Sequence, residues 1–322
     1  MATQRRNPNI HTADLTKLDW VYVTQNDRKT VDTLRRKFGF DALDLRETQP
    51  PLQRAKLVVR DEYLFMILLY PVMDKKTGVV LPAEVDFFIT PKLLVTMNAN
   101  NIKALETLFL GCSAALKRSQ KKGTTNSAYV CIDEDVAHVL YRILSDLLEQ
   151  IFPMVVALSD QVDRIKHRIF DDFDKDLIQE LLRIKTNIVA VRKAIQAHKS
   201  VMRQLIYASE GRFPIHRLEA YFQRLVDNSK ELWDTLEVQR DTIDALHETT
   251  ASLIDYRINQ IMKTLTIFSV IVFPLTLLAA VFGMNTAKMP LVDRPNGFWI
   301  IVALMLVGTL GMLLLFKRKK WL

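Results

Sequence analysis

Two long stretches without any charged residue dominate the pattern of hydrophobic and polar positions along the chain. They cover Leu265–Phe282 and Phe298–Phe316, which are eighteen and nineteen residues long. At 1.5 Å per helical residue these lengths span roughly 27–29 Å, about the thickness of the hydrocarbon core of a bilayer. Buried core helices of a soluble protein would keep a stripe of charges, which both stretches lack. The pattern therefore predicts two transmembrane helices.

The N-terminal part of the chain, residues 18–110, alternates short strand-like and helix-like stretches, which predicts a mixed α/β domain. The basic segment Lys117–Ser127 is predicted to be a loop-like linker. The expected strands are Trp20–Val23, Tyr63–Tyr70, Val79–Ile89 and Leu93–Met97, and the expected helices are Arg28–Phe38, ending at Gly39, and one that follows Asn98–Asn101.

From Asp133 onward, apolar residues recur at spacings of three and four, which is typical of amphipathic helices. The last of these helices has no glycine before Gly283, and its only interruption is Pro274. If continuous, it is about 100 Å long and needs neighbouring helices alongside it. The expected helices are Asp133–Ile151, Val155–Phe170 with Pro153 near its start, Asp176–Ile206, and Ile215–Phe282.

Together these elements predict an α+β cytoplasmic domain, a long stalk helix and two C-terminal transmembrane helices. The expected division is residues 1–212 for the cytoplasmic α/β and helical domain, 213–264 for the stalk, 265–316 for the two spans and their loop, and 317–322 for a basic tail.

The formal net charge of +8 owes half its value to Lys317-Arg318-Lys319-Lys320, directly after the second span. Basic residues beside spans favour the cytoplasmic side, so both termini are expected in the cytoplasm of a cell with this protein in its inner (plasma) membrane. Residues 1–12 are polar and basic and do not predict a signal peptide. Anionic lipid headgroups, and no nucleic acid, are the expected partners of the basic tail.

The chain shows no spacing of Ser, His, Asp or Cys that indicates a nucleophilic enzyme, and no phosphate-binding loop. No enzymatic activity and no organic cofactor are therefore expected. Cys112 and Cys131 form no C-x-x-C pair, which predicts reduced thiols in place of a disulfide or a zinc site. The run Asp171–Asp176 is interpreted as a solvated helix junction in preference to a divalent-cation site.

The first predicted span carries hydroxyl residues on one face. At 100° per residue, Thr266, Ser269 and Thr276 fall within about 80° of one another. Ser and Thr also join packed helices, so this face alone leaves helix packing and pore lining equally open. We call the face the hydroxyl stripe, and its residues are Met262, Thr266, Ser269, Phe273, Thr276 and Ala280.

Polar and acidic residues precede the hydroxyl stripe on roughly the same side of the helix. They are Asn259, Asp255 and Glu248. Two of the three are negatively charged, as a path for cations prefers, and they favour pore lining. Neither span contains an acid or a histidine that would relay protons, so transport would run down an electrochemical gradient.

The first span ends in Gly283-Met284-Asn285, which alone would indicate an ordinary helix C-cap. Placed between two terminal spans, and followed by a short loop and a basic tail ending in Trp-Leu, it resembles the CorA-type magnesium channel family. The resemblance covers nearly the whole chain. Further segments that are similar to the family's are Tyr141–Leu144, Tyr221–Phe222, Met262–Thr266 and Phe273–Thr276.

The resemblance implies a homopentameric funnel, in which five long helices continue as pore-lining first spans inside a ring of second spans. It implies passive import of Mg²⁺, and of cobalt, through a selectivity filter of Gly283, Met284 and Asn285. Met262 and Leu265 would form a hydrophobic gate. The residues implied to face the pore are Asn259, Met262, Leu265, Ser269, Phe273 and Thr276.

Neutral amide oxygens at the mouth suit Mg²⁺, because this small ion gives up its water shell reluctantly. Five Asn285 side chains can hydrogen-bond the hydrated ion, whereas a ring of carboxylates would release it slowly. Gly283 is expected to let the chain leave the helix and to let the copies approach closely.

The resemblance also implies gating by cytoplasmic Mg²⁺ bound between subunits, for which Asp227 and Asp86 are the candidate ligands. Arg224 stands where a stalk aspartate is expected, and Lys288 stands where many relatives carry an acid. Two alternatives remain open: a zinc or cobalt/nickel transporter of the same architecture, and a membrane-anchored coiled-coil scaffold.

Overall fold

The computed structural model describes residues 7–98, 102–122, 131, 133–169, 175–211, 213–284 and 296–321. The chain divides into two compact units, Met1–Leu246 and His247–Leu322. The division falls within one long helix, α8, which covers Glu219–Phe282. The sequence predicted this helix to start at Ile215, but Pro214–Leu218 forms a short 3-10 helix, η1, ahead of it.

The first unit is built on a six-stranded sheet with the strand order β1-β2-β6-β5-β4-β3. Strands β2 and β6 are parallel, and the other neighbours are antiparallel. The sequence predicted β2, β4, β5 and β6 and missed β1 and β3. The strands are β1 Ile10–Asp14, β2 Asp19–Val23, β3 Lys56–Val59, β4 Leu64–Met73, β5 Val80–Ile89 and β6 Leu93–Met97.

One face of this sheet is covered by α1 (Arg28–Phe38) and α2 (Ala42–Glu47). Asp27 caps α1 by accepting from the backbone N–H of Thr30, and α1 ends at Gly39, which has a φ of 71°. The left-handed conformation at Gly39 confirms the predicted end of this helix, because glycine adopts it without steric cost. The core on this face contains buried apolar side chains from both layers: Val21, Leu34, Phe40, Leu45, Phe65, Ile67, Phe88 and Met97.

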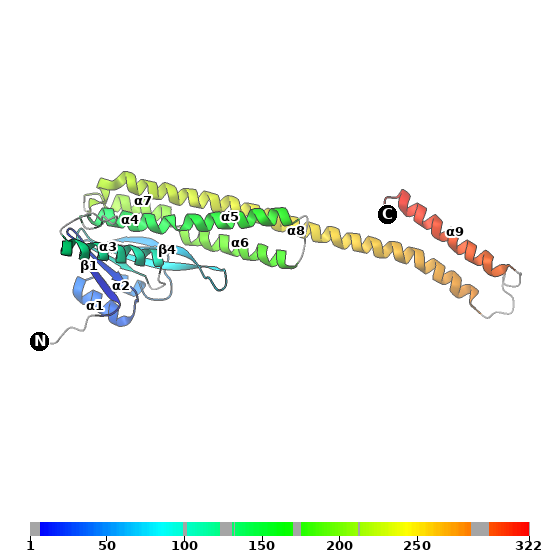
Figure 1. The fold of residues 1–322 in the computed structure, drawn as a ribbon, viewed down its shortest axis with the longest axis horizontal. Coiled ribbons are helices and arrows are strands. Elements are labelled where there is room, and N and C mark those ends of the chain that lie inside the picture. Colours follow the sequence, from blue (N-terminus) through cyan, green and yellow to red (C-terminus); the bar gives the residue numbers. More distant parts are fainter. Residues whose placement is uncertain are drawn as a thin grey trace. The chain divides into compact units, whose positions relative to one another are not determined.

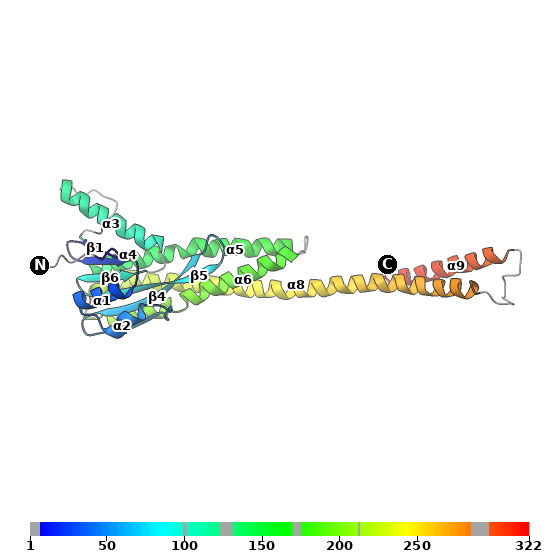
Figure 2. The same cartoon turned by 90° about the horizontal axis from the view of Figure 1, so that it is seen from below.

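The opposite face carries a helical layer, seen from two directions in Figures 1 and 2. Two side chains of this layer bond to the sheet side. Asn187 of α6 accepts from the N–H of Val80 and donates to the carbonyl of Gly78, and Nε2 of His198 on α7 contacts the carbonyl of Leu69. The helices are α3 Lys103–Lys122, α4 Val136–Glu149, α5 Ile151–Arg168, α6 Lys175–Ile195 and α7 His198–Ala208.

Two predictions about this layer were wrong. The segment Lys117–Lys122 belongs to α3 and is not a loop. Its lysines, arginine and glutamine are good helix formers, and the only glycine of the predicted linker comes after it, at position 123. Asp176–Ile206 is not one helix either, since α6 ends at Ile195 and α7 starts at His198. Pro153 lies in the first turn of α5, as expected, where a missing N–H costs nothing. The run at 171–174 and the remainder of the predicted linker at 123–127 lie outside the described residues.

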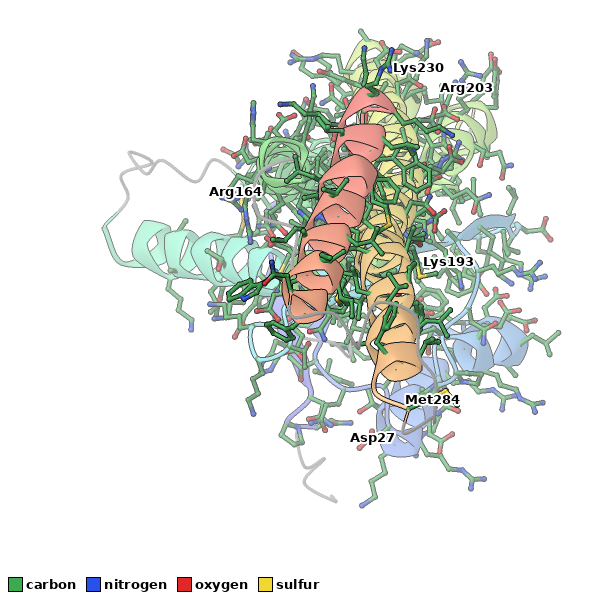
Figure 3. The ribbon with its side chains drawn as sticks, turned by 90° about the vertical axis from the view of Figure 1, so that its right-hand side faces the viewer. Asp27, Arg164, Lys193, Arg203, Lys230 and Met284 are labelled. Atoms are coloured by element: carbon green, nitrogen blue, oxygen red, sulfur yellow. A yellow bond between two sulfur atoms is a disulfide. The ribbon has the colours of Figure 1, made fainter. Side chains whose placement is uncertain are left out.

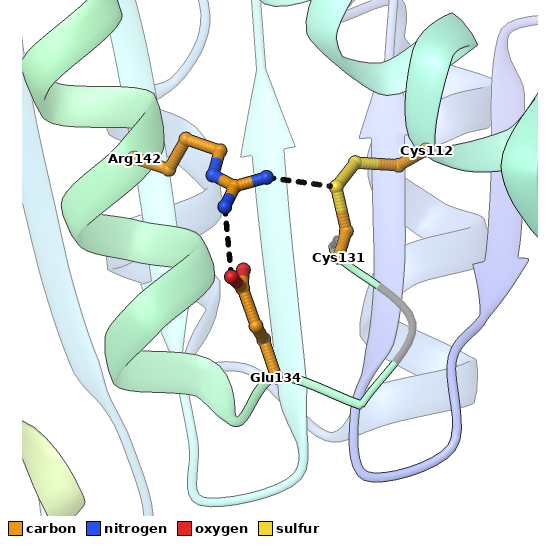
Figure 4. The surroundings of a disulfide bond; sticks show 4 residues. All are labelled: Cys112, Cys131, Glu134 and Arg142. Carbon is orange, nitrogen blue, oxygen red and sulfur yellow. Dashed lines mark hydrogen bonds and ion pairs between the residues drawn. A yellow bond between two sulfur atoms is a disulfide. The ribbon is translucent and has the colours of Figure 1, made fainter. Parts of the chain in front are cut away.

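Cys112 and Cys131 form a disulfide, with their Cα atoms 5.7 Å apart (Figure 4). The prediction of two reduced thiols was therefore wrong. The fold brings α3 against the segment that precedes α4, and this distance lies within the range that a disulfide requires. Neither the spacing of the two cysteines nor the composition of the chain reveals that proximity.

The second unit contains the C-terminal part of α8 and helix α9, Gly297–Arg318. Both helices are long and apolar enough to cross a membrane, as the sequence predicted. The Nζ of Lys263 on α8 donates to the carbonyl oxygen of Lys320, 3.3 Å away, and Trp321 stacks on Phe316. The hydrogen bond joins the basic end of the chain to α8, whereas the ring contact lies within that end itself.

Candidate functional site

The candidate ion path is the hydroxyl stripe on the C-terminal part of α8. Most of the less exposed side chains of this part recur every three or four residues, at Lys263, Ile267, Ile271, Leu275, Leu278 and Phe282. Lys263 contacts the end of α9, so this is the face directed towards α9. The hydroxyl stripe is centred roughly 160° around the helix axis from this face, on nearly the opposite side of α8, and α9 does not cover it. Ser269 of the hydroxyl stripe is also half-buried, whereas the other members of the stripe are exposed.

Large apolar side chains on and beside the hydroxyl stripe are exposed in the single chain. Met262 is 55% exposed, Leu265 56% and Phe273 72%. Exposure of this extent on a membrane-length helix requires lipid or other helices to cover it. The two residues predicted for the hydrophobic gate, Met262 and Leu265, are thus not covered by other parts of the chain.

The threonine hydroxyls of α8 donate to backbone carbonyls of their own helix. Thr266 Oγ1 lies 2.7 Å from the carbonyl oxygen of Met262, and Thr276 Oγ1 lies 2.9 Å from that of Val272. Because each hydroxyl proton is used within the helix, the oxygen lone pairs remain available as acceptors. The stripe therefore offers hydrogen-bond acceptors along an otherwise apolar helix.

The end of α8 has the hydrogen bonding of a helix C-terminus. The N–H of Gly283 donates to Ala279, and the N–H of Met284 donates to Val281 (Met284 is labelled in Figure 3). A Cβ at position 283 would lie 3.0 Å from the carbonyl oxygen of Ala279, which is a tight contact. Asn285 and residues 286–295, with Lys288, lie outside the described residues, so the filter at Gly283, Met284 and Asn285 stays a prediction.

Asp86 lies in β5, opposite Ile67 of β4 and Met97 of β6, and is 1% exposed. Burial raises its pKa well above the ordinary value, and the charge of Glu84 raises it further. Glu84 lies two residues earlier, on the same side of the strand, and burial raises its pKa as well. The sequence prediction missed Glu84, although the spacing Glu-x-Asp within the predicted strand Val79–Ile89 could have revealed it.

Asp227 lies on the exposed surface of α8, where its carboxylate accepts from Gln223 Nε2 at 3.2 Å. Arg224, one turn earlier, is also exposed. Among the residues that the structure describes, no group of three or more His, Cys, Asp and Glu side chains is arranged to hold a metal ion.

An α/β unit joined through a long helix to two apolar C-terminal helices defines a class of membrane protein. The sequence matches the family of the CorA-like Mg²⁺ transporter protein over residues 16–318, and the chain belongs to that family.

The chain is similar along its length to several proteins of this kind. The cobalt/magnesium transport protein CorA of Methanocaldococcus jannaschii is 22% identical over 95% of this chain and 92% of its own, and its complete structure shares the fold with a TM-score of 0.78. The putative metal ion transporter YfjQ of Bacillus subtilis is 27% identical, over 98% of this chain and 94% of its own. The full-length CmaX structure, 18% identical, has a TM-score of 0.73 and covers 98% of this chain and 93% of its own.

Proposed function

We propose that five copies of this chain form a passive channel that imports divalent cations, chiefly Mg²⁺, across the inner (plasma) membrane. The observation that carries the proposal is the hydroxyl stripe, which α9 leaves uncovered and which presents acceptor oxygens. The water molecules of a hydrated cation are hydrogen-bond donors, so a path lined with acceptors suits an ion that keeps its water shell. Family membership supports the assembly and the ion.

The membrane potential supplies the driving force. A doubly charged cation gains about 4.6 kcal/mol on entering a compartment whose interior is 100 mV negative. Uptake of such an ion needs no chemical energy source. Both chain termini would lie in the cytoplasm, with Lys317 and its basic neighbours next to anionic lipid headgroups.

Selection would take place at Gly283, Met284 and Asn285. A ring of amide oxygens from Asn285 would hydrogen-bond the hydrated ion at the outer mouth, as argued from the chemistry of Mg²⁺. The tight space beside Gly283 is consistent with a glycine requirement there. Met262 and Leu265 would form the gate, and the rest of the hydroxyl stripe, between the gate and Gly283, would form the conduit.

Cytoplasmic Mg²⁺ would close the pore by binding between neighbouring subunits, with Asp227 and Asp86 as ligands. Asp227 is exposed and accessible to a metal ion. Asp86 is buried and has a raised pKa, so the metal ion would have to displace its proton and open its surroundings. Inhibition by Mg²⁺ would then weaken as the pH falls.

The main alternative is transport of zinc, cobalt or nickel by the same architecture. The likeness to CmaX supports it, because CmaX of Pseudomonas aeruginosa is called a divalent cation transporter and this name does not specify the ion. A membrane-anchored coiled-coil scaffold is the second alternative, and it predicts no ion flux.

The test is ion flux into proteoliposomes that contain the full-length protein. Mg²⁺, Co²⁺, Ni²⁺ and Zn²⁺ are offered separately at an inside-negative potential, with and without a pH gradient. The proposal expects Mg²⁺ influx that follows the potential, ignores the pH gradient and is lost in Asn285→Ala. Flux of Zn²⁺ that requires the pH gradient would favour the alternative. Equal leakage of all ions through wild type and Asn285→Ala would contradict both.

A further inference from the structure

The first unit contains a cavity of about 300 Å³ between α4 and the start of α8. It brings together two segments that are far apart in the sequence, Tyr141-Arg142 and Tyr221-Phe222. The residues of its lining that matter here are Glu134, Tyr141, Arg142, Asp146 and Tyr221. The volume is at the lower end of the range for pockets that hold small organic molecules.

Aromatic rings form one wall of the cavity. The rings of Tyr141 and Tyr221 lie 5.3 Å apart at an interplanar angle of 73°, and Phe222 lies 6.0 Å from Tyr141. Tyr221 is half-exposed, so the wall is accessible from solvent. Tyrosine faces attract ammonium groups through the ring quadrupole and cover the methylene groups attached to them.

Arg142, the cation of this lining, is already bound on two sides (Figure 4). Its Nη2 donates to Glu134 Oε1 at 2.8 Å, and its Nη1 lies 3.6 Å from Cys131 Sγ. The ion pair with Glu134 offsets the positive charge of Arg142, which lowers the attraction of this guanidinium for an anionic ligand. The neighbouring His138 is paired with Asp135.

Two carboxylates belong to the lining, those of Glu134 and Asp146. Glu134 Oε2 is buried and has no hydrogen-bond partner among the described residues. Asp146 is partly buried, and burial followed by the charge of Glu149 raises its pKa. Burial likewise raises the pKa of Glu134. With one guanidinium against two carboxylates, the cavity has an excess of negative charge when both acids are ionised.

We propose that this cavity binds a linear alkylammonium ion of the diamine or polyamine class. An ammonium group would meet the partly buried carboxylate of Asp146, and the methylene chain would lie on the tyrosine wall. A bare divalent metal ion fits less well, because no cluster of three or more metal-ligating side chains occurs in the described part of the chain. The inference does not depend on ion transport.

The test is calorimetric titration of the full-length protein in detergent with 1,4-diaminobutane, and with the neutral 1,4-butanediol and MgCl₂ as comparisons. We expect saturable binding of the diamine and none of the diol. Asp146→Asn and Tyr221→Leu should each weaken diamine binding at least tenfold, whereas the controls Asp163→Asn and Tyr207→Leu, at exposed positions outside the cavity, should change it less than twofold.

Thermal unfolding of each variant without ligand shows whether the fold is intact, and the shape-conserving Asp146→Asn decides the matter if Tyr221→Leu unfolds. Absence of saturable diamine binding by wild type overturns the proposal. So does Mg²⁺ binding that Asp146→Asn abolishes, or equal loss of diamine binding in Asp146→Asn and Asp163→Asn.

Discussion

The carboxylate of Asp44 accepts two hydrogen bonds from the guanidinium of Arg60, from Nε at 2.9 Å and from Nη2 at 2.6 Å. Tyr63 donates its hydroxyl to the same carboxylate at 2.6 Å. The Asp44 side chain is 2% exposed, whereas that of Arg60 is 37% exposed. This cluster fixes α2 to the residues that connect β3 and β4.

The first prediction concerns Arg60→Met, which leaves a buried carboxylate without its cation. Loss of one partner from a buried pair is strongly destabilising, although solvent around Arg60 reduces the effect. We expect the melting temperature at pH 7 to fall by about 4–8 °C in thermal unfolding of the full-length protein. Arg240→Met, which removes an exposed ion pair with Asp241, is the matched control and should change it by about 1 °C or less. An equal effect of both variants contradicts the prediction.

The pH dependence of this pair follows from the pKa of Asp44. Burial would raise that pKa, but the hydrogen bonds from Arg60 and Tyr63 outweigh burial, so the pKa lies below its ordinary value. A carboxyl group with a lowered folded-state pKa stabilises the fold above its unfolded pKa of about 4, and this stabilisation is lost as the pH falls through the folded-state value. The difference between wild type and Arg60→Met should therefore shrink below about pH 4.

The local pattern predicted strands at Tyr63–Tyr70 and Val79–Ile89, and the structure pairs them as the antiparallel strands β4 and β5. Gly78 adopts a φ of 66° between the two strands, and its N–H donates to Asp74. The break between α6 and α7 was not predictable in this way. His198 is buried against the carbonyl of Leu69, which lies 129 residues away in the sequence. Such a contact overrides an unbroken helical pattern.

The same distinction, between local patterns and contacts of distant segments, applies to the remaining features. The hydroxyl stripe was predictable from the helical period alone, since its residues belong to one helix and each residue is rotated by about 100° from the one before it. The disulfide of Cys112 and Cys131 depends on how α3 lies against the segment before α4, and no local pattern encodes that. The ring of Asn285 depends on other copies of the chain, so it stays a prediction.

The second prediction separates pore lining from helix packing. Thr266→Val and Thr276→Val keep the side-chain shape and remove an acceptor oxygen, which five copies would present as a ring. We expect each to reduce Mg²⁺ influx into proteoliposomes roughly 3–10-fold, the equivalent of about one hydrogen bond. The control is Thr309→Val on α9, whose hydroxyl also donates to its own helix, at 2.8 Å. Equal loss of flux in Thr309→Val contradicts a special role of the stripe.

The third prediction concerns the disulfide between Cys112 and Cys131, which closes a segment with a sequence separation of 19. A loop of this length restricts the unfolded chain by about 3 kcal/mol in the chain-entropy description. We expect a thiol reductant to lower the melting temperature of wild type by several degrees and to leave the Cys112→Ala/Cys131→Ala variant unchanged. Mass spectrometry of unreduced peptides checks the bond directly. Recovery of both cysteines as alkylated thiols, after blocking in intact cells, would show that the bond is absent there.

The fourth prediction concerns Asp86, whose pKa is raised by burial and then by the neighbouring charge of Glu84. When the pKa of a carboxyl group is raised in the folded state, the folded protein loses stability as the pH rises from about 4 towards that raised pKa. The reason is that the group ionises more easily in the unfolded chain. Asp86→Asn has no proton to lose at this position. Its melting temperature should therefore exceed that of wild type by at least about 2 °C at pH 8, and the difference should narrow towards pH 4. Asp163→Asn, at an exposed position of α5, should follow the wild-type profile throughout. Parallel pH profiles of Asp86→Asn and wild type would mean that Asp86 is ionised in the folded protein, and that a metal ion would not have to compete with a proton for it.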